Sequence, residues 1–273
     1  MELYDAIFYR KSIRNYSNKQ IKIPLMESVK DICSNITYLN KDLNIKAHVI
    51  DRGHLIHFLM GKGCKVKAPH YIVVTSNKGN DYLQNIGFAI ENVVLKLTTL
   101  GLATCWLECN LKREDILEFV ELEEIESDDE DYEKKLEYPV AIIAFGYPEK
   151  SESLFRPLNG EPDRERVKHI SKNLDRKWIK ILNAVRVAPS IKNCQPWMFY
   201  GEENIINIYE EKQKKAIENM SKISMGIALK HFDIACKKFD IKVKYAKKKH
   251  KNKMSKEYFI SIVDVDNEYT QLT

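Results

Sequence analysis

The sequence predicts a fold of the α+β class, in which helices cover β-sheets. Two short apolar runs, Tyr71–Thr75 and Tyr138–Phe145, are rich in β-branched and aromatic residues, which is typical of buried strands. A long and mostly apolar segment, Asp81–Leu100, follows the first run and predicts a helix. Gly101 comes directly after this segment, where glycine commonly ends a helix.

Apolar spacing and proline placement predict the remaining elements of the first half. Pro24 is followed by apolar residues at helical spacing, and proline is favoured in the first turn of a helix. Segment Ala103–Glu108 has no clear pattern and is expected to be irregular. The other predicted elements are a short helix at Glu2–Arg10, a polar loop at Arg10–Tyr16, a helix at Leu25–Ile36, a strand at Ile45–Ile50 and a helix at His54–Leu59.

The second half repeats this mixture of helices and strands. We expect one helix over Arg164–Val187, because Trp178, Ile181, Leu182 and Val185 recur at helical spacing. A polar loop at Ala188–Trp197 follows it. The remaining predicted elements are strands near Met198–Tyr200 and Ile205–Tyr209, a helix at Ser224–Phe239 and two final strands.

Length and composition exclude several classes of protein. The chain has 273 residues, of which 44% are hydrophobic, so it can bury a core as one large domain or two small ones. No apolar run approaches the ~20 residues of a membrane helix, and Met1–Lys11 does not resemble a signal peptide. We therefore expect a cytoplasmic protein whose six cysteines are reduced thiols, with no metal site. Only 10 glycines are present, which argues against a glycine-rich dinucleotide cradle.

Charge is distributed unevenly within the net +5. Glu121–Glu137 is acidic and is expected to be a solvated loop or a frayed helix end. Lys237–Lys256 is strongly basic and has two interpretations: contact with a nucleic acid, or a polar turn between two strands. The runs on either side of it alternate as strands do, which favours the turn, and we expect no nucleic-acid partner.

An internal repeat relates the two halves. When Gly87 is aligned with Gly226, the 15 residues after each glycine are FAIENVVLKLTTLGL and IALKHFDIACKKFDI. Apolar residues coincide at most positions of the two segments, and polar residues coincide at several others. Any two amphipathic helices share some of this periodicity, so the repeat suggests a duplicated unit without establishing one.

Two polar loops carry the candidate chemistry. In Arg10-Lys11-Ser12-Ile13-Arg14, an extended backbone would place both arginines and the serine on one side, where guanidinium groups can bind a phosphate. An ordinary basic surface loop is an equal alternative. In Ala188–Trp197, two prolines stiffen a loop whose Ser, Asn and Gln side chains could bind a planar heterocycle, or could form a self-satisfied turn.

Together these loops resemble the nitroreductase family of FMN-dependent oxidoreductases. Arg10–Arg14 is similar to the family's RRSxR loop, and Ala188–Trp197 is similar to its APSxxNxQPW loop. Gly101–Trp106 (GLATCW) resembles the GLGxxW turn beside the flavin. A weaker match is Phe145–Pro148 followed by Lys150 and Arg156, which resembles a C-terminal GYP segment.

The resemblance implies FMN as the cofactor and NAD(P)H as the electron donor, with hydride transfer through the flavin to a nitroaromatic, quinone or similar small molecule. No catalytic side chain is then required, because the flavin carries the chemistry. The implied cofactor contacts fall into three groups. They are Arg10, Ser12, Arg14 and Arg156 around the phosphate and ribityl chain; Pro189, Ser190, Asn193 and Gln195 at the ring; and Thr104 and Cys105 in the turn beside it.

One departure from the family's pattern has a structural implication. Family members carry both loops near the N-terminus and form each site across a dimer interface, whereas here the loops lie in different halves. The resemblance therefore implies a nitroreductase-like fold with helix-covered antiparallel sheets. Two degenerate repeats, 1–160 and 161–273, would form a pseudo-dimer within one chain and keep one flavin site. Such a chain could be a monomer or a homodimer, and a flavin-binding carrier or sensor without turnover is the alternative function.

Overall fold

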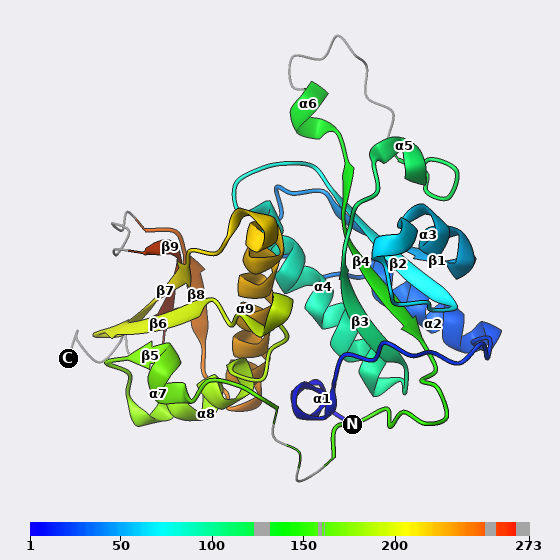
Figure 1. The fold of residues 1–273 in the computed structure, drawn as a ribbon. Helices are drawn as coiled ribbons and strands as arrows, with labels where there is room; N and C mark the ends of the chain where they lie inside the picture. The colour runs from blue at the N-terminus through cyan, green and yellow to red at the C-terminus, as the bar shows by residue number, and fades with distance from the viewer. Residues whose placement is uncertain (123–131, 158–159, 161, 249–254, 266–273) are drawn as a thin grey trace.

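The computed structural model describes residues 1–122, 132–157, 160, 162–248 and 255–265. Two long helices, α4 (Tyr82–Thr99) and α9 (Glu218–Lys238), pack against each other at the centre, and one β-sheet lies on the outer side of each helix (Figure 1). The predicted α+β class is therefore confirmed, with strands that pair mostly in antiparallel fashion.

The first sheet is formed by the N-terminal part of the chain and has the order β1-β2-β4-β3. All neighbouring strands in it are antiparallel. Its strands are β1 (Ile45–Ile50), β2 (His70–Ser76), β3 (Ala103–Glu108) and β4 (Tyr138–Gly146). The helices of this part are α1 (Leu3–Tyr9), α2 (Ile23–Ser34), α3 (Gly53–Leu59), η1 (Gly61–Gly63), α5 (Arg113–Ile116) and α6 (Tyr132–Lys135).

The second sheet has the order β5-β6-β7-β9-β8 and is antiparallel except for the short β5–β6 pair. Its strands are β5 (Ser171–Lys172), β6 (Trp197–Glu202), β7 (Ile205–Glu211), β8 (Val243–Ala246) and β9 (Lys256–Asp264). The accompanying helices are α7 (Val167–Ile170), α8 (Arg176–Val185), η2 (Ile191–Asn193) and η3 (Lys215–Ile217).

Apart from β5, the two sheets have the same connectivity. In the first, the chain order β1, β2, α4, β3, β4 gives the spatial order β1-β2-β4-β3. In the second, the chain order β6, β7, α9, β8, β9 gives β6-β7-β9-β8. The second strand of each sheet also carries a register shift against the fourth, at Val74/Thr75 in one and at Ile208/Tyr209 in the other.

The two central helices approach each other most closely at a pair of glycines. A Cβ atom on Gly87 would lie 2.0 Å from the carbonyl oxygen of Ile223, and one on Gly226 would lie 1.8 Å from the carbonyl oxygen of Gln84. Each glycine thus faces the residue three positions before the other glycine. The contact is reciprocal, and only a hydrogen atom fits at either position.

The structure corrects two element assignments. Ala103–Glu108 is a strand, not irregular, because it pairs with β4 along its whole length. Arg164–Val187 is not one helix: α7 and α8 are separated by β5, which pairs with β6, and by Asn173, whose φ is +55°. The predicted end of α4 is confirmed, since Gly101 has φ +81° and follows the last helical turn.

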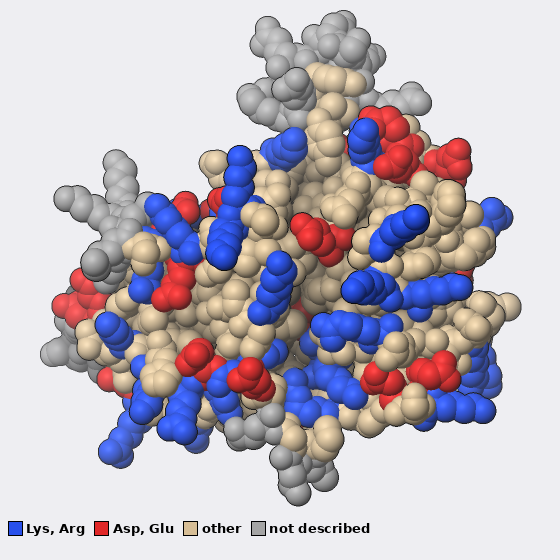
Figure 2. Space-filling view, viewed as in Figure 1, with Lys and Arg blue, Asp and Glu red and all other residues tan. Residues whose placement is uncertain are grey.

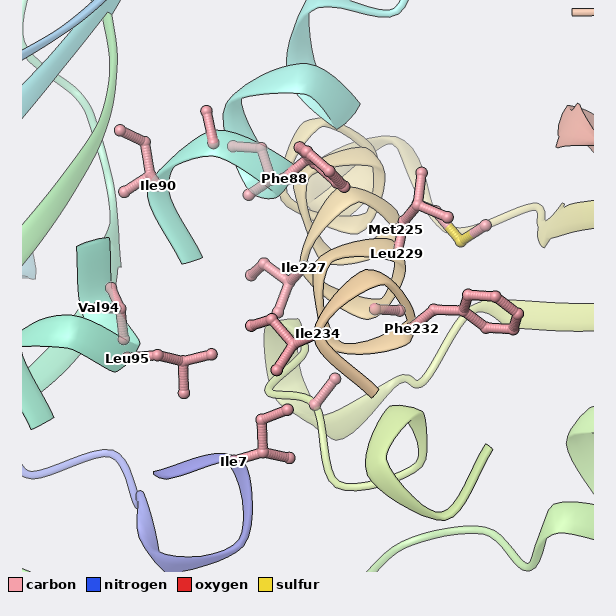
Figure 3. Packing of buried hydrophobic residues seen from close by; sticks show 14 of the residues in the cluster. Ile7, Phe88, Ile90, Val94, Leu95, Met225, Ile227, Leu229, Phe232 and Ile234 are labelled. Atoms are coloured by element: carbon pink, nitrogen blue, oxygen red, sulfur yellow. The ribbon is translucent and has the colours of Figure 1, made fainter. Parts of the chain in front are cut away.

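The largest core cluster is continuous across α4 and α9 and joins both sheets. Figure 3 shows Phe88 and Leu95 of α4 facing the side of α9 that carries Ile227 and Ile234. On the far side of α9, the ring of Phe232 stacks between those of Trp178 and Phe199. The two halves therefore share this core cluster, while a second, smaller cluster lies within the first half alone.

The charged segments of the sequence are described only in part. Most of the acidic segment Glu121–Glu137 lies outside the described residues, as does 249–254 within the basic segment. On either side of that basic stretch, β8 and β9 form an antiparallel pair, which agrees with the predicted turn between two strands. No helix among the described residues has both the length and the apolar content to cross a membrane.

Candidate functional site

The arginine loop of the first half is an extended segment that lies against the sheet. Ser12 forms a parallel bridge with Thr104 of β3, and the Ile13 amide donates to the Thr104 carbonyl at 3.1 Å. Arg10 follows α1, is almost fully buried, and donates from Nη2 to Ser12 Oγ at 3.2 Å. The sheet edge thus fixes the loop, and it holds Arg10 and Ser12 side by side.

The proline-flanked loop of the second half has an unusual backbone. Lys192, Asn193 and Gln195 all have positive φ values, of 47°, 58° and 45°. Non-glycine residues in this region are destabilised by roughly 1–3 kcal/mol each, so surrounding contacts must hold the loop. Ser190 Oγ accepts from the Gln195 amide at 3.0 Å, and Ser224 Oγ on α9 accepts from the Ile191 amide at 3.2 Å.

These two loops meet at a cavity of about 110 Å³. Ser12 and Arg14 contribute from the first half, and Pro189 and Ser190 contribute from the second. Trp106 of β3 forms a further part of the wall. The complete lining is Ser12, Arg14, Trp106, Pro189, Ser190, Ile191, Lys192, Met220, Ser224 and Ile227. It contains two cationic side chains and no carboxylate.

A cluster of four arginines, which we call the arginine cluster, adjoins the buried end of the arginine loop: Arg10, Arg156, Arg164 and Arg186. Burial, together with the charges of Arg156 and Arg10, lowers the pKa of Arg164 to about 10. Burial and the charge of Arg10 also lower the pKa of Arg156. Guanidinium groups remain protonated at neutral pH, so the cluster concentrates positive charge that an anion would neutralise.

Several polar atoms at this end are buried and lack a hydrogen-bond partner among the described residues. They are Nε of Arg10, Nε of Arg164 and Oγ1 of Thr104. A second cavity of about 440 Å³ opens here, lined in part by Arg156 and Arg186. Figure 2 shows Lys and Arg side chains gathered on the surface in this region, around α1. Buried donors that lack a partner, close to further arginines, are the chemistry of an anion site.

Asn193 and Gln195 lie in the proline-flanked loop, but their side chains form hydrogen bonds with the segment before α7. Asn193 Oδ1 accepts from the Arg164 guanidinium, and its Nδ2 donates to the carbonyl of Asp163 at 3.0 Å. Gln195 Oε1 accepts from the Glu165 amide at 2.8 Å. Neither residue lines the smaller cavity, so their predicted contacts with a ring stay a prediction.

Cys105 follows Thr104 in β3 and is buried. Its pKa is raised by burial, and the charges of Arg14 and Arg10 oppose that rise. A thiol with a raised pKa is protonated at neutral pH and is a poor nucleophile. The structure thus places Cys105 behind the site and gives it no activated thiolate.

The structure adds Arg164 and Arg186 to the candidate residues. Neither stands in a motif: Arg164 precedes α7 by three residues and Arg186 caps the C-terminal end of α8. A sequence pattern cannot identify them, because only the packing of α8 and of the segment before α7 brings them to Arg10 and Arg156. Trp106, in contrast, belongs to the GLATCW segment and could have been selected from the sequence.

Comparison with known proteins gives a matching family and solved structures of similar fold. A family described as "Putative TM nitroreductase" matches residues 2–236. A crystal structure of a putative nitroreductase from Thermotoga maritima is similar to this chain with a TM-score of 0.60 and 22% identity, covering 96% of this chain and 94% of the other. No curated protein sequence matches the chain.

Other solved structures match with lower TM-scores. A nitroreductase family protein from Clostridium difficile has a TM-score of 0.47 and 21% identity, covering 63% of this chain and 98% of the other. A nitroreductase with bound FMN from Bacteroides fragilis has a TM-score of 0.44 and 16% identity, covering 60% of this chain and 96% of the other.

Proposed function

The chain belongs to the nitroreductase family described above, and we propose that it is an FMN-dependent oxidoreductase. In this proposal, FMN binds between the two loops, NAD(P)H is the electron donor, and a nitroaromatic, quinone or similar small molecule is the acceptor. When bound, FMN supplies the hydride and electron transfer chemistry. The residues of the chain bind the cofactor, orient it and shape the space for the acceptor.

The observation that carries the proposal is the arginine cluster at the end of the arginine loop. Arg10 is buried and Arg156 and Arg164 are half-buried, and gathering these cations in one place is unfavourable unless an anion is bound. The unpaired Nε atoms of Arg10 and Arg164 supply donors for such an anion. The phosphate of FMN would be that anion, with Ser12 as a neutral donor on its ribityl side.

The flavin ring would lie in the smaller cavity, between Trp106 and the Pro189–Ser190 backbone. At about 110 Å³ this cavity is smaller than the ~300 Å³ at which ligand pockets usually begin. Binding a three-ring system therefore requires rim side chains, such as those of Arg14 and Lys192, to move outward. Both carry a positive charge that would favour the anionic form of a reduced flavin.

We also propose that the chain is an internal duplication that acts as a pseudo-dimer, with 1–160 and 161–273 as its halves. Support comes from the shared strand order of the two sheets and from the reciprocal contacts of Gly87 and Gly226. The smaller cavity takes one loop from each half, so each chain would form one complete site. We expect about one FMN per chain.

Purification and a visible absorption spectrum test the proposal. A yellow protein with about one FMN per chain that oxidises NAD(P)H in the presence of a nitroaromatic or a quinone supports it. A colourless protein that takes up no added FMN contradicts it. Two FMN per chain would retain the cofactor and reject the single-site arrangement.

The alternative is a carrier or sensor that binds flavin without turnover. Steady-state NAD(P)H oxidation separates the two functions, because a carrier can be reduced once but does not turn over with an added acceptor. The assay is run with NADH and NADPH in parallel, each with and without the acceptor.

A further inference from the structure

A buried polar network lies directly behind the wall of the smaller cavity. Glu91 of α4 is completely buried, and its Oε2 accepts a hydrogen bond from Nε1 of Trp106 at 2.8 Å. Its other oxygen, Oε1, lies 3.1 Å from Nε2 of His231 on α9. The Nδ1 atom of that histidine lies 3.0 Å from the carbonyl oxygen of Ala184 on α8. The network therefore links both halves of the chain.

The hydrogen bonds determine what this network can do. A carbonyl oxygen only accepts, so Nδ1 of His231 must carry a hydrogen. One further proton then lies between Nε2 of His231 and the carboxyl group of Glu91, which makes the pair electrically neutral as a whole. Only a paired carboxyl group is tolerated at full burial. The second carboxyl oxygen remains available to hold the indole of Trp106.

The position of His231 on its helix supports a link to the cavity. Ser224 and Ile227 of α9 both line the cavity, and His231 lies one further turn along the same face. Trp106 lines the same cavity. Loss of the carboxyl group would leave the indole N–H without its partner, and the indole would be free to change its orientation.

The duplicated architecture provides an internal comparison. The residues that lie 139 positions after Glu91 and Trp106 are Lys230 and Tyr245. There, Nζ of Lys230 lies 3.6 Å from the centre of the Phe88 ring, and the tyrosine hydroxyl donates to Asp233 at 3.3 Å. The carboxylate–indole pair thus occurs on the side that has the loops of the candidate site.

We propose that Glu91, held by His231, is a positioning residue that fixes the indole of Trp106 as the wall of the flavin cavity. This inference rests on the proposed function in one respect, because it takes FMN as the ligand of the cavity. The hydrogen bond between Trp106 and Glu91 is independent of that function. Glu91 does not touch the ring and acts only through Trp106.

Three variants test the proposal. Glu91→Gln retains an oxygen that accepts from Trp106 and an amide that donates to Nε2 of His231, so FMN affinity should stay within about twofold. Glu91→Met removes the acceptor and should weaken FMN binding roughly tenfold. Lys230→Met is the matched control at the related position of α9 and should leave the affinity unchanged.

A double-mutant cycle with Trp106→Phe isolates the positioning role. If Glu91 acts through Trp106, Glu91→Met has no further effect on FMN affinity in the Trp106→Phe background. Equal weakening in both backgrounds would overturn the proposal, as would wild-type affinity in Glu91→Met. A general loss of packing would appear instead as reduced unfolding free energy with additive effects on binding.

The protein without FMN gives a second readout. Indole N–H signals of the three tryptophans are resolved by NMR, and Trp106→Phe identifies the one that belongs to Trp106. We expect this signal to be shifted downfield and protected from exchange in wild type and Glu91→Gln, and to lose both properties in Glu91→Met. An unchanged signal in Glu91→Met overturns the inference. Failure of the wild-type protein to bind FMN contradicts the proposed function, but the NMR comparison of the Trp106 signal still tests the hydrogen bond to Glu91.

Discussion

At the scale of single residues, the arginine cluster gives the most direct prediction. Arg10→Ala removes a buried cation with an unpaired Nε, and a charge-assisted hydrogen bond contributes about 1.5–3 kcal/mol. We expect FMN affinity to fall roughly 10- to 100-fold by fluorescence titration. Riboflavin, which lacks the phosphate, should bind wild type and variant equally.

The control for this prediction is Arg176→Ala, which removes an exposed arginine from the start of α8. It should leave both affinities unchanged. If Arg10→Ala weakens riboflavin and FMN equally, Arg10 does not bind the phosphate and the orientation of the cofactor is wrong.

Glu210 on β7 gives a prediction about pH. It is buried, it accepts from Ser221 Oγ at 2.6 Å, and burial raises its pKa from 4.5 to about 7. The folded chain therefore binds more protons than the unfolded chain between these values, so stability falls as pH rises through this range. Ionising the buried group destabilises the fold by up to about 3 kcal/mol above pH 7.

Glu210→Gln removes the titration and keeps an acceptor for Ser221. Urea unfolding of both proteins at pH 5 and pH 7.5 gives the comparison, and the difference between them isolates this carboxyl group. We expect the variant to lose less stability than wild type over this interval. Equal losses would mean that Glu210 titrates in its ordinary range.

At the scale of elements, the contact between α4 and α9 gives a prediction about packing. Gly87→Ala places a methyl group 2.0 Å from a backbone oxygen that cannot move independently of its helix. Separating the helices should destabilise the fold by about 3 kcal/mol. Gly63→Ala is the control, because nothing lies within 4 Å of its Cβ position, and it should change stability by less than about 0.5 kcal/mol.

Gly226, on the other side of the same contact, allows a stricter test of this prediction. Gly226→Ala should have a similar effect, because its Cβ would lie 1.8 Å from the carbonyl of Gln84. The double variant should lose less stability than the sum of the two, since the helices need to separate only once. Strict additivity would show that the two contacts are independent.

Elements also show where sequence patterns succeed and fail. The central strands and α4 are predicted well, because they are apolar and end at a glycine that adopts positive φ. Strand β3 is missed because its residues do not alternate between apolar and polar, so that only its pairing with β4 defines it. The helix expected over Arg164–Val187 is interrupted by β5, whose pairing with β6 depends on tertiary structure.

The candidate site also contains residues that sequence motifs identify and residues that only the folded structure brings together. Ser12, Arg14 and Ser190 line one cavity, and all three belong to loops that can be selected from the sequence. The side-chain partners of Asn193 and the position of Arg164 could not be predicted, because they depend on how the segment before α7 folds back on the loop. Local pattern gives the loops, whereas the arginine cluster arises only from packing.

At the scale of the whole molecule, the shared core and the site between the halves predict one cooperative unit. A ligand that binds only the folded chain at 100 times its Kd stabilises it by about 2.7 kcal/mol. For a chain of this size we expect a single thermal transition that FMN raises by roughly 5–10 °C. Two transitions, of which FMN moves one, would show that the halves unfold separately.

Helices α4 and α9 belong to one chain, and this affects how their sequences can diverge. In a symmetric dimer, one gene encodes both sides of the interface, so every substitution changes both sides. Here each side has its own codons, and the related positions 91 and 230 already carry residues of different chemistry, Glu91 and Lys230. Evolution or a protein engineer can thus alter one side of the contact between α4 and α9 while the other side keeps its sequence.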